Sequence, residues 1–221
     1  MSIIVHKNGT MEYLAAEGIA VSHAFTTQYG GVSQGAFASL NIAHHRGDLD
    51  ENVGKNLKIL ANTLDFDLEK LVLTRQTHSD IVRAVTAADH IGTDHYAYPE
   101  CDALITARAG VALMVFTADC TPILLWDPVT GAVGAIHAGW RGTAADIAGK
   151  TVYVHSQFDL VQRVSAQISD EFGISGQFVS GLIETIRYHF YDSFINVHCD
   201  FSFIIPAHRQ CAYFQCCLRW P

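Results

Sequence analysis

Three short segments each carry a histidine or a cysteine where an apolar run, expected to form a strand, gives way to a turn. These are residues 74–80 with His78, residues 117–122 with Cys120, and residues 136–143 with His137. Strand ends are places where folds commonly present reactive groups. Two imidazoles and one thiolate would give a zinc ion three protein ligands and leave a fourth position open, as in a catalytic metal site. The gaps of 42 and 17 residues between the ligands are too long for a local motif, so spacing alone does not establish the site.

Each of these residues also has a simpler interpretation. A single histidine on an apolar strand is more often a hydrogen-bonded core residue, and a cysteine after a buried strand is usually a small hydrophobic residue. Three other histidines, His44, His45 and His95, lack a comparable context. We interpret His44 and His95 as surface or loop residues. His45 stands just before a Gly-Asp pair, and a pocket role for it has weaker support than the three ligands have.

The hydrophobic pattern predicts one helix followed by a series of strands. Apolar residues recur at helical spacing in residues 50–64, which indicates an amphipathic helix that covers a sheet. From residue 71 onward, short apolar runs are typical of strands buried on both faces. These runs are residues 71–73, 81–82, 103–105, 111–116, 123–126 and 132–136. Residues 127–131 predict a hairpin turn, which would bring Cys120 and His137 to the same end of the sheet.

A second helix is expected after His137. Thr143 and Asp146 fit a capping box that would open a helix over residues 144–150. A helix start offers free backbone donors and a partial positive charge to an anion. Arg141 beside it could hold a phosphate through two parallel hydrogen bonds. In the alternative interpretation the neighbouring glycines only form the turn, and Arg141 points into solvent.

The three segments, together with several others in the same order, closely resemble the polyphenol oxidase (laccase) domain family. The other matching segments are residues 25–33 (FTTQYGGVS), 39–41 (SLN), 45–48 (HRGD) and 102–106 (DALIT). The resemblance runs from about residue 24 to about residue 150. It implies an α/β fold with a mixed sheet flanked by helices, like that of the cytotoxic necrotizing factor catalytic domain. It also aligns His78, Cys120 and His137 with the family's metal ligands.

Members of this family act as purine nucleoside phosphorylases and are also described as adenosine deaminases. The resemblance therefore implies a zinc enzyme that converts adenosine, inosine or guanosine with phosphate to free base and ribose 1-phosphate, with adenosine deamination as a second reaction. Zinc could polarise a substrate oxygen or activate water. Arg141, Asp80 and Asp102 are the catalytic candidates, and Asp119 is a third nearby carboxylate. Carboxylates at strand ends are, however, often only turn caps.

Other functions remain open. His137 could activate Cys120 as the nucleophile of a cysteine hydrolase or deamidase, which the fold-level likeness to the toxin domain suggests. The chain could also be an inactive metal-binding protein. A copper phenol oxidase ranks low, because copper oxidases need many more histidine ligands in several clusters. We therefore expect zinc rather than copper.

Length and charge narrow the class of protein. A chain of 221 residues can hold one sizeable domain and bury a core without disulfides. Its formal charge of −8, with Lys and Arg scattered, offers no basic stripe to nucleic acid, so free nucleosides and phosphate are the expected partners. No export signal and no run of roughly 18 apolar residues is found, so we expect no membrane partner, reduced cysteines and a cytoplasmic protein. A monomer or a homodimer is expected.

The composition changes near residue 150. Residues 151–221 hold 13 of the 23 aromatic residues and four of the six cysteines but no lysine. We therefore divide the domain into a laccase-like core over residues 1–150, which carries the metal site, and a divergent segment over residues 151–221. This segment is either a divergent structural element or the product of a reading-frame change, and we favour the second. Within it, residues 175–194 predict a helix only weakly.

Overall fold

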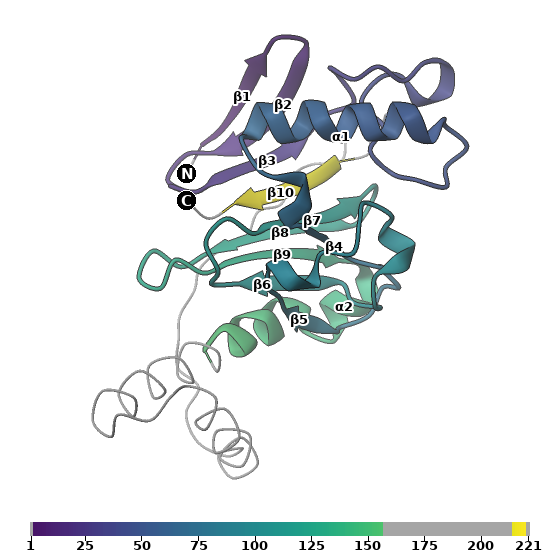
Figure 1. The fold of residues 1–221 in the computed structure, drawn as a ribbon. Coiled ribbons are helices and arrows are strands. Elements are labelled where there is room, and N and C mark those ends of the chain that lie inside the picture. Colours follow the sequence, from purple (N-terminus) through teal and green to yellow (C-terminus); the bar gives the residue numbers. More distant parts are fainter. Residues whose placement is uncertain (1, 157–213, 220–221) are drawn as a thin grey trace.

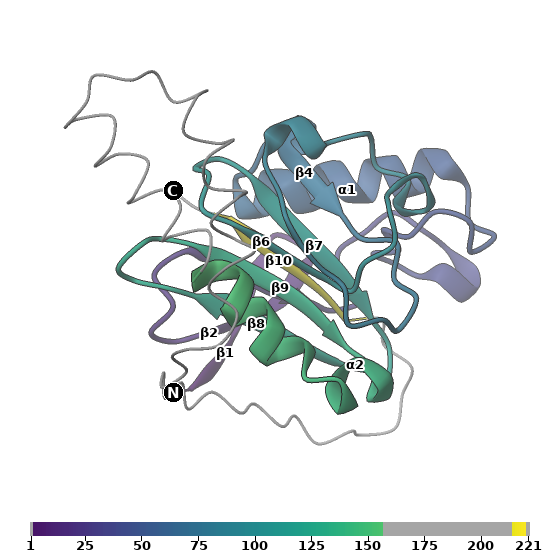
Figure 2. The same ribbon diagram turned by 90° about the horizontal axis from the view of Figure 1, so that it is seen from below.

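A computed structural model describes residues 2–156 and 214–219, which form two β-sheets packed against each other (Figures 1 and 2). The six-stranded sheet has the order β1 (Ile3–Asn8), β2 (Met11–Ala16), β3 (Ser22–Thr26), β10 (Phe214–Arg219), β7 (Ala112–Thr117) and β4 (Leu71–Leu73). The four-stranded sheet has the order β5 (Val82–Ala84), β6 (Ala103–Thr106), β9 (Val133–Ala138) and β8 (Thr121–Trp126). Figure 1 shows α1 (Asp50–Leu64) beside the first sheet and α2 (Trp140–Ala144) on the far side of the second.

Both sheets mix parallel and antiparallel pairs. β4 runs parallel to β7, and β5 runs parallel to β6, whereas the other strand pairs are antiparallel. The expected α/β class with mixed pairing and flanking helices is confirmed, although the strands divide between two sheets instead of one. β4, β6, β7 and β9 are almost entirely buried, as their continuous apolar runs predict, but β8 is only half-buried because it is an edge strand.

The helix predicted over residues 50–64 is confirmed at both ends by α1. Its apolar side chains, among them Val53, Leu57 and Leu60, are buried in the main hydrophobic core. Burial of each such side chain stabilises the fold by about 1.5–3 kcal/mol. Four short 3₁₀ helices lie in the described loops: η1 (Gly35–Phe37), η2 (Leu68–Lys70), η3 (Ala87–Asp89) and η4 (His95–Ala97). Among the described residues, no helix is long and apolar enough to cross a bilayer.

The hairpin predicted over residues 127–131 is confirmed as the connection between β8 and β9. In the antiparallel register Thr121 lies opposite Ala138, and Pro122 lies opposite His137. Cys120, which precedes β8, therefore comes close to His137 near the end of β9. The hairpin is the local reason that two of the three proposed ligands meet.

The helix start predicted after His137 is wrong. Thr143 does not cap a helix, because α2 begins earlier, at Trp140, with Gly139 as its N-cap. A second helical stretch begins at residue 147 and continues through residue 156. Asp146 caps this stretch, since its carboxylate accepts a hydrogen bond from the Gly149 backbone N–H at 3.2 Å. Asp146 thus caps a helix, but this helix begins about one turn later than the capping box predicted.

Residues 151–221 are described only in part. Residues 151–156 continue the helical stretch, and β10 is inserted between β3 and β7, antiparallel to both. The sequence pattern did not predict this strand. The weakly predicted helix over residues 175–194 lies outside the described residues, and the reading-frame change stays a prediction.

Asp127 ties the β8–β9 hairpin to the helical stretch over residues 147–156. Its carboxylate accepts hydrogen bonds from Thr130 Oγ1 at 2.7 Å and from the Val129 N–H at 2.8 Å, and it pairs with His155 Nε2 at 2.8 Å. Burial opposes ionisation, but these three contacts outweigh it and lower the pKa of Asp127 to about 2. The ionised carboxylate therefore stabilises the folded state.

We expect Asp127→Asn to lower the free energy of unfolding by about 2 kcal/mol at pH 7. The folded-state pKa lies below the unfolded value, so this contribution is complete above about pH 4 and is lost as the pH falls towards 2. Urea unfolding at pH 7 and at pH 2.5 measures the difference. Glu69→Gln is the control, because Glu69 also pairs with a histidine, His90, but its side chain is 85% exposed, and a change below about 0.5 kcal/mol is expected. An Asp127 effect of equal size at both pH values would contradict the assignment.

Candidate metal centre

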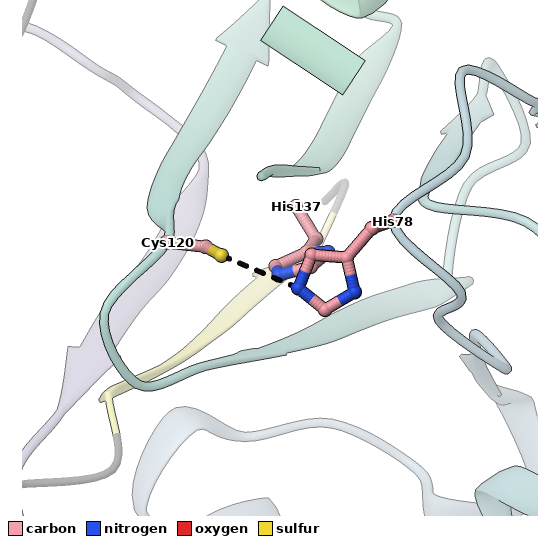
Figure 3. A group of neighbouring side chains, drawn as sticks. All are labelled: His78, Cys120 and His137. Carbon is pink, nitrogen blue, oxygen red and sulfur yellow. Dashed lines mark hydrogen bonds between the residues drawn. The ribbon is translucent and has the colours of Figure 1, made fainter. Parts of the chain in front are cut away.

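The three predicted ligands, His78, Cys120 and His137, converge at one end of the sheets (Figure 3). His78 lies in the exposed loop after β4, Cys120 in the half-buried turn between β7 and β8, and His137 in the buried strand β9. Their potential ligand atoms all lie within 4.8 Å of one another. Cys120 Sγ lies 3.6 Å from His78 Nε2, and the two imidazole rings meet edge to face with centroids 4.9 Å apart.

These donors fit a zinc ion. Zinc binds imidazole nitrogen at about 2.0–2.1 Å and thiolate sulfur at about 2.3 Å in tetrahedral geometry, which places a nitrogen and a sulfur ligand about 3.6 Å apart. The Cys120–His78 separation of 3.6 Å equals this value. Three protein donors also leave the fourth position for water or substrate, as in catalytic zinc sites. Among the described residues, no other group of three such side chains is close enough to hold a metal.

Asp102 lies directly behind the ligands. It is fully buried, with 0% exposure, at the N-terminal end of β6. Its carboxylate accepts hydrogen bonds from the backbone N–H groups of Thr77, His78 and Ser79 at 3.2, 3.1 and 2.7 Å, and from Ser79 Oγ at 2.6 Å. It also contacts His137 Nδ1 at 2.7 Å. One buried carboxylate therefore fixes both the loop of the first ligand and the ring of the third.

The contact with Asp102 sets the tautomer of His137. An ionised carboxylate only accepts, so Nδ1 of His137 carries the proton and Nε2 is free to bind a metal. Burial alone would raise the pKa of Asp102, but the hydrogen bonds from His137, Ser79 and the Thr77 backbone lower it to about 2. A carboxylate–histidine pair of this kind orients a metal ligand and raises its basicity.

Backbone geometry brings the first ligand into place. His78 adopts the left-handed conformation, with φ of 59°, which lets three successive N–H groups point to one side and surround the Asp102 carboxylate. Gly139 allows a close approach from the other side, since a Cβ there would lie 2.6 Å from His78 Cδ2 and 3.4 Å from Cys120 Sγ. Any larger residue would displace His78. The interpretation of Gly139 as a turn residue alone is therefore incomplete, because this glycine also packs closely against the candidate ligands.

The remaining candidates lie around this centre. Arg141 is exposed on α2, and its guanidinium carbon lies 5.1 Å from the centroid of the Trp140 ring. Asp80 forms an ion pair with Lys150, whose hydrogen bond lowers the pKa of Asp80. Asp119 is exposed beside Cys120. None of these three side chains belongs to the ligand cluster.

The thiol of Cys120 is not activated by its protein surroundings. Burial, followed by the charges of Asp119 and Asp102, raises the pKa of Cys120. A nucleophilic cysteine needs the opposite shift, which neighbouring cations or a helix N-terminus usually provide. Cys120 Sγ contacts His78 Nε2 at 3.6 Å, whereas the predicted hydrolase would pair Cys120 with His137. The protein surroundings alone therefore do not produce the thiolate that a cysteine hydrolase needs.

His95 is not a surface residue, although it does lie in a loop, as one of its two interpretations had it. It belongs to η4 and is only 7% exposed. Its Nδ1 is buried and has no hydrogen-bond partner. His44 and His45 lie near it, with side chains that pair with Asp50 and Asp94 at 2.8 and 2.9 Å. Sequence reasoning missed this cluster because its members meet only through long-range contacts, and the one available signal was the family-like segment around His45.

The chain is similar to several known proteins. The family model described as "Multi-copper polyphenol oxidoreductase laccase" matches residues 22–177, which extends beyond the resemblance seen in the sequence. Purine nucleoside phosphorylase YlmD of Geobacillus stearothermophilus is 45% identical over 132 residues, covering 58% of this chain and 48% of the relative. Adenosine deaminase RL5, from an unknown prokaryotic organism, is 38% identical over 141 residues, covering 62% of this chain and 54% of the relative.

The fold is also similar to a solved structure. The crystal structure of YlmD from Geobacillus stearothermophilus matches with a TM-score of 0.63 and 39% identity, over 69% of this chain and 58% of that one. The chain spans about half the length of the curated relatives that it matches. Because the family model matches well over half of the sequence, the chain belongs to the multi-copper polyphenol oxidoreductase laccase family.

Proposed function

We propose that this chain is a purine nucleoside phosphorylase that acts at a zinc ion held by His78, Cys120 and His137. The observation that carries the proposal is the convergence of these ligand atoms within 4.8 Å in a chain that is 45% identical to a named purine nucleoside phosphorylase over the matched region. The substrates would be adenosine, inosine or guanosine with inorganic phosphate. The products would be the free base and ribose 1-phosphate.

Zinc is preferred to copper for this site. Two histidines and a cysteine also hold copper in electron-transfer sites, but those sites add a weak axial ligand, often a methionine. Met11 and Met114, the two methionines in the described part of the chain, are packed in the hydrophobic core. Zinc bound here would supply a Lewis acid that polarises a substrate oxygen.

Asp102 would act as a positioning residue. Its two oxygens are occupied by His137, by Ser79 and by the backbone of the His78 loop. A fully buried carboxylate with these contacts does not reach substrate, so we assign it the orientation of His137 and His78. Asp80 is 41% exposed and, unlike Asp102, is accessible from solvent, so it is the better candidate for proton transfer.

Arg141 would bind the phosphate. It follows His137 by four residues, and the start of its helix contacts the ligands through Gly139. A guanidinium offers parallel N–H donors that match two phosphate oxygens. Phosphorolysis passes through a sugar with oxocarbenium character, by analogy with glycoside cleavage, so phosphate must be held against the anomeric carbon.

Deamination of adenosine is a second candidate, because one relative with 38% identity is named adenosine deaminase. A single assay separates the two reactions. The purified protein, loaded with zinc, is incubated with inosine and phosphate, and hypoxanthine and ribose 1-phosphate should appear in equal amounts. Adenosine without phosphate should give inosine only if deamination also occurs. If the protein holds one zinc per chain but releases no base, phosphorolysis is excluded. If the protein is equally active with copper alone, the preference for zinc is excluded.

A further inference from the structure

A continuous row of five aromatic rings lies outside the ligand cluster. It runs through His44, His45, Tyr96, His95 and Phe116. Successive ring centroids are 6.2, 5.3, 4.3 and 5.1 Å apart. These residues come from three distant parts of the sequence: the loop before α1, η4 and strand β7. We call these five residues the aromatic row.

His95 is the buried centre of the row. Only 7% of it is exposed, and its Nδ1 has no partner. Burial and then the charge of Arg46 lower the pKa of His95 to about 4, so the ring is neutral at pH 7. A neutral imidazole has one N–H donor and one acceptor nitrogen. A buried polar nitrogen without a partner is rare in native structures and calls for a bound water or ligand.

The inner end of the row is connected to the candidate metal centre. Gln76 Nε2 donates to the Phe116 carbonyl at 2.6 Å, and the Phe116 N–H donates to Gln76 Oε1 at 2.7 Å. Gln76 lies two residues before His78, and Phe116 lies four residues before Cys120. Four residues of extended chain span at most about 14 Å. The row therefore starts beside the two segments that carry the first two ligands.

The outer end of the row is accessible. Tyr96 is 47% exposed, and its ring lies between those of His45 and His95. The contact between His45 Nε2 and Asp94 Oδ2, at 2.9 Å, holds the two loops together on this side. An exposed ring beside a buried, neutral imidazole offers a π-face for stacking and a ring nitrogen for hydrogen bonding.

We propose that the aromatic row is the nucleobase subsite, with the purine stacked against Tyr96 and its edge hydrogen-bonded to a ring nitrogen of His95. The inference rests on the proposed function, which supplies the purine nucleoside as the ligand. Aromatic side chains bind bases because every base has a π-face. A neutral imidazole nitrogen can donate to the C6 carbonyl of inosine or guanosine, or accept from the 6-amino group of adenosine.

Two variants and a matched control test this subsite. We expect Tyr96→Ala and His95→Ala to raise KM for inosine about tenfold, while KM for phosphate stays within about twofold of the wild-type value. Tyr96→Ala removes a half-exposed ring and leaves the core intact, so it remains informative if His95→Ala fails to fold. The control is His6→Ala, because His6 also stacks on a tyrosine, Tyr13, at 5.2 Å, but in the β1–β2 hairpin, and it should change neither constant.

Equilibrium dialysis of hypoxanthine against each full-length protein separates this proposal from the proposed function. If the wild type cleaves inosine but Tyr96→Ala keeps its KM for inosine and its affinity for hypoxanthine, the subsite is wrong and phosphorolysis stands. If the wild type cleaves no nucleoside but binds hypoxanthine, and Tyr96→Ala loses that binding, the subsite stands without phosphorolysis. A wild type that binds neither hypoxanthine nor inosine overturns the subsite.

Discussion

Cys120→Ala is expected to abolish zinc retention and to lower kcat/KM for inosine by about a thousandfold or more. The thiolate is the only anionic donor in the cluster, and its loss leaves two imidazoles, fewer than the three protein ligands of catalytic zinc sites. A bound metal contributes several kcal/mol to transition-state stabilisation, and each 1.36 kcal/mol changes a rate tenfold. Metal content by mass spectrometry and initial rates of hypoxanthine release measure both effects.

Cys101→Ala is the matched control. Cys101 is the other free cysteine whose side chain the structure describes, and it is fully buried in the core. Burial raises the pKa of its thiol to about 11, so it stays protonated and does not bind metal. This variant should lose some stability but keep its zinc and its rate. A Cys120→Ala protein with full zinc content and unchanged kcat/KM would remove the basis of the proposed function.

The proximity of two of the three candidate ligands could be predicted because local patterns encode it. The apolar runs around residues 117–126 and 132–138 and the turn over residues 127–131 specify a hairpin. A hairpin fixes which residues face each other across its two strands, so the proximity of Cys120 and His137 follows from local sequence. The position of His78 depends on contacts across two sheets, and only the family resemblance assigned it to the same centre.

The support behind the ligands could not be predicted in the same way. Asp102 contacts residues 77–79, about 24 positions earlier, and His137, 35 positions later. The sequence shows only a carboxylate at the start of a strand, which fits a turn cap, a proton shuttle or a positioning residue equally well. The same limit applies to His95, whose burial depends on Phe116 and Tyr96 together. Strand β10 was missed because its pairing partners lie about 100 and 190 residues away along the chain.

Asp102→Asn is expected to weaken zinc binding by about 10-fold to 100-fold, because the loss of a group that hydrogen-bonds to a metal ligand has an effect of this size. An asparagine has one acceptor oxygen in place of two, and its NH₂ group would face the backbone N–H groups of the His78 loop or the Nδ1–H of His137. Unsatisfied buried donors should also lower the free energy of unfolding by roughly 3 kcal/mol. Zinc competition with a chromogenic chelator and urea unfolding of the metal-free protein measure the two effects separately.

Asp89→Asn controls for the loss of a hydrogen-bonded aspartate elsewhere in the same protein. Asp89 Oδ2 accepts from Thr86 N at 2.7 Å and from Thr86 Oγ1 at 3.1 Å in the capping box of η3. This variant should lose about 1 kcal/mol of stability and keep its zinc affinity. If Asp102→Asn lowered stability but bound zinc as tightly as the wild type, Asp102 would support the fold without orienting His137. The metal centre would then owe its geometry to the β8–β9 hairpin and the close approach of Gly139.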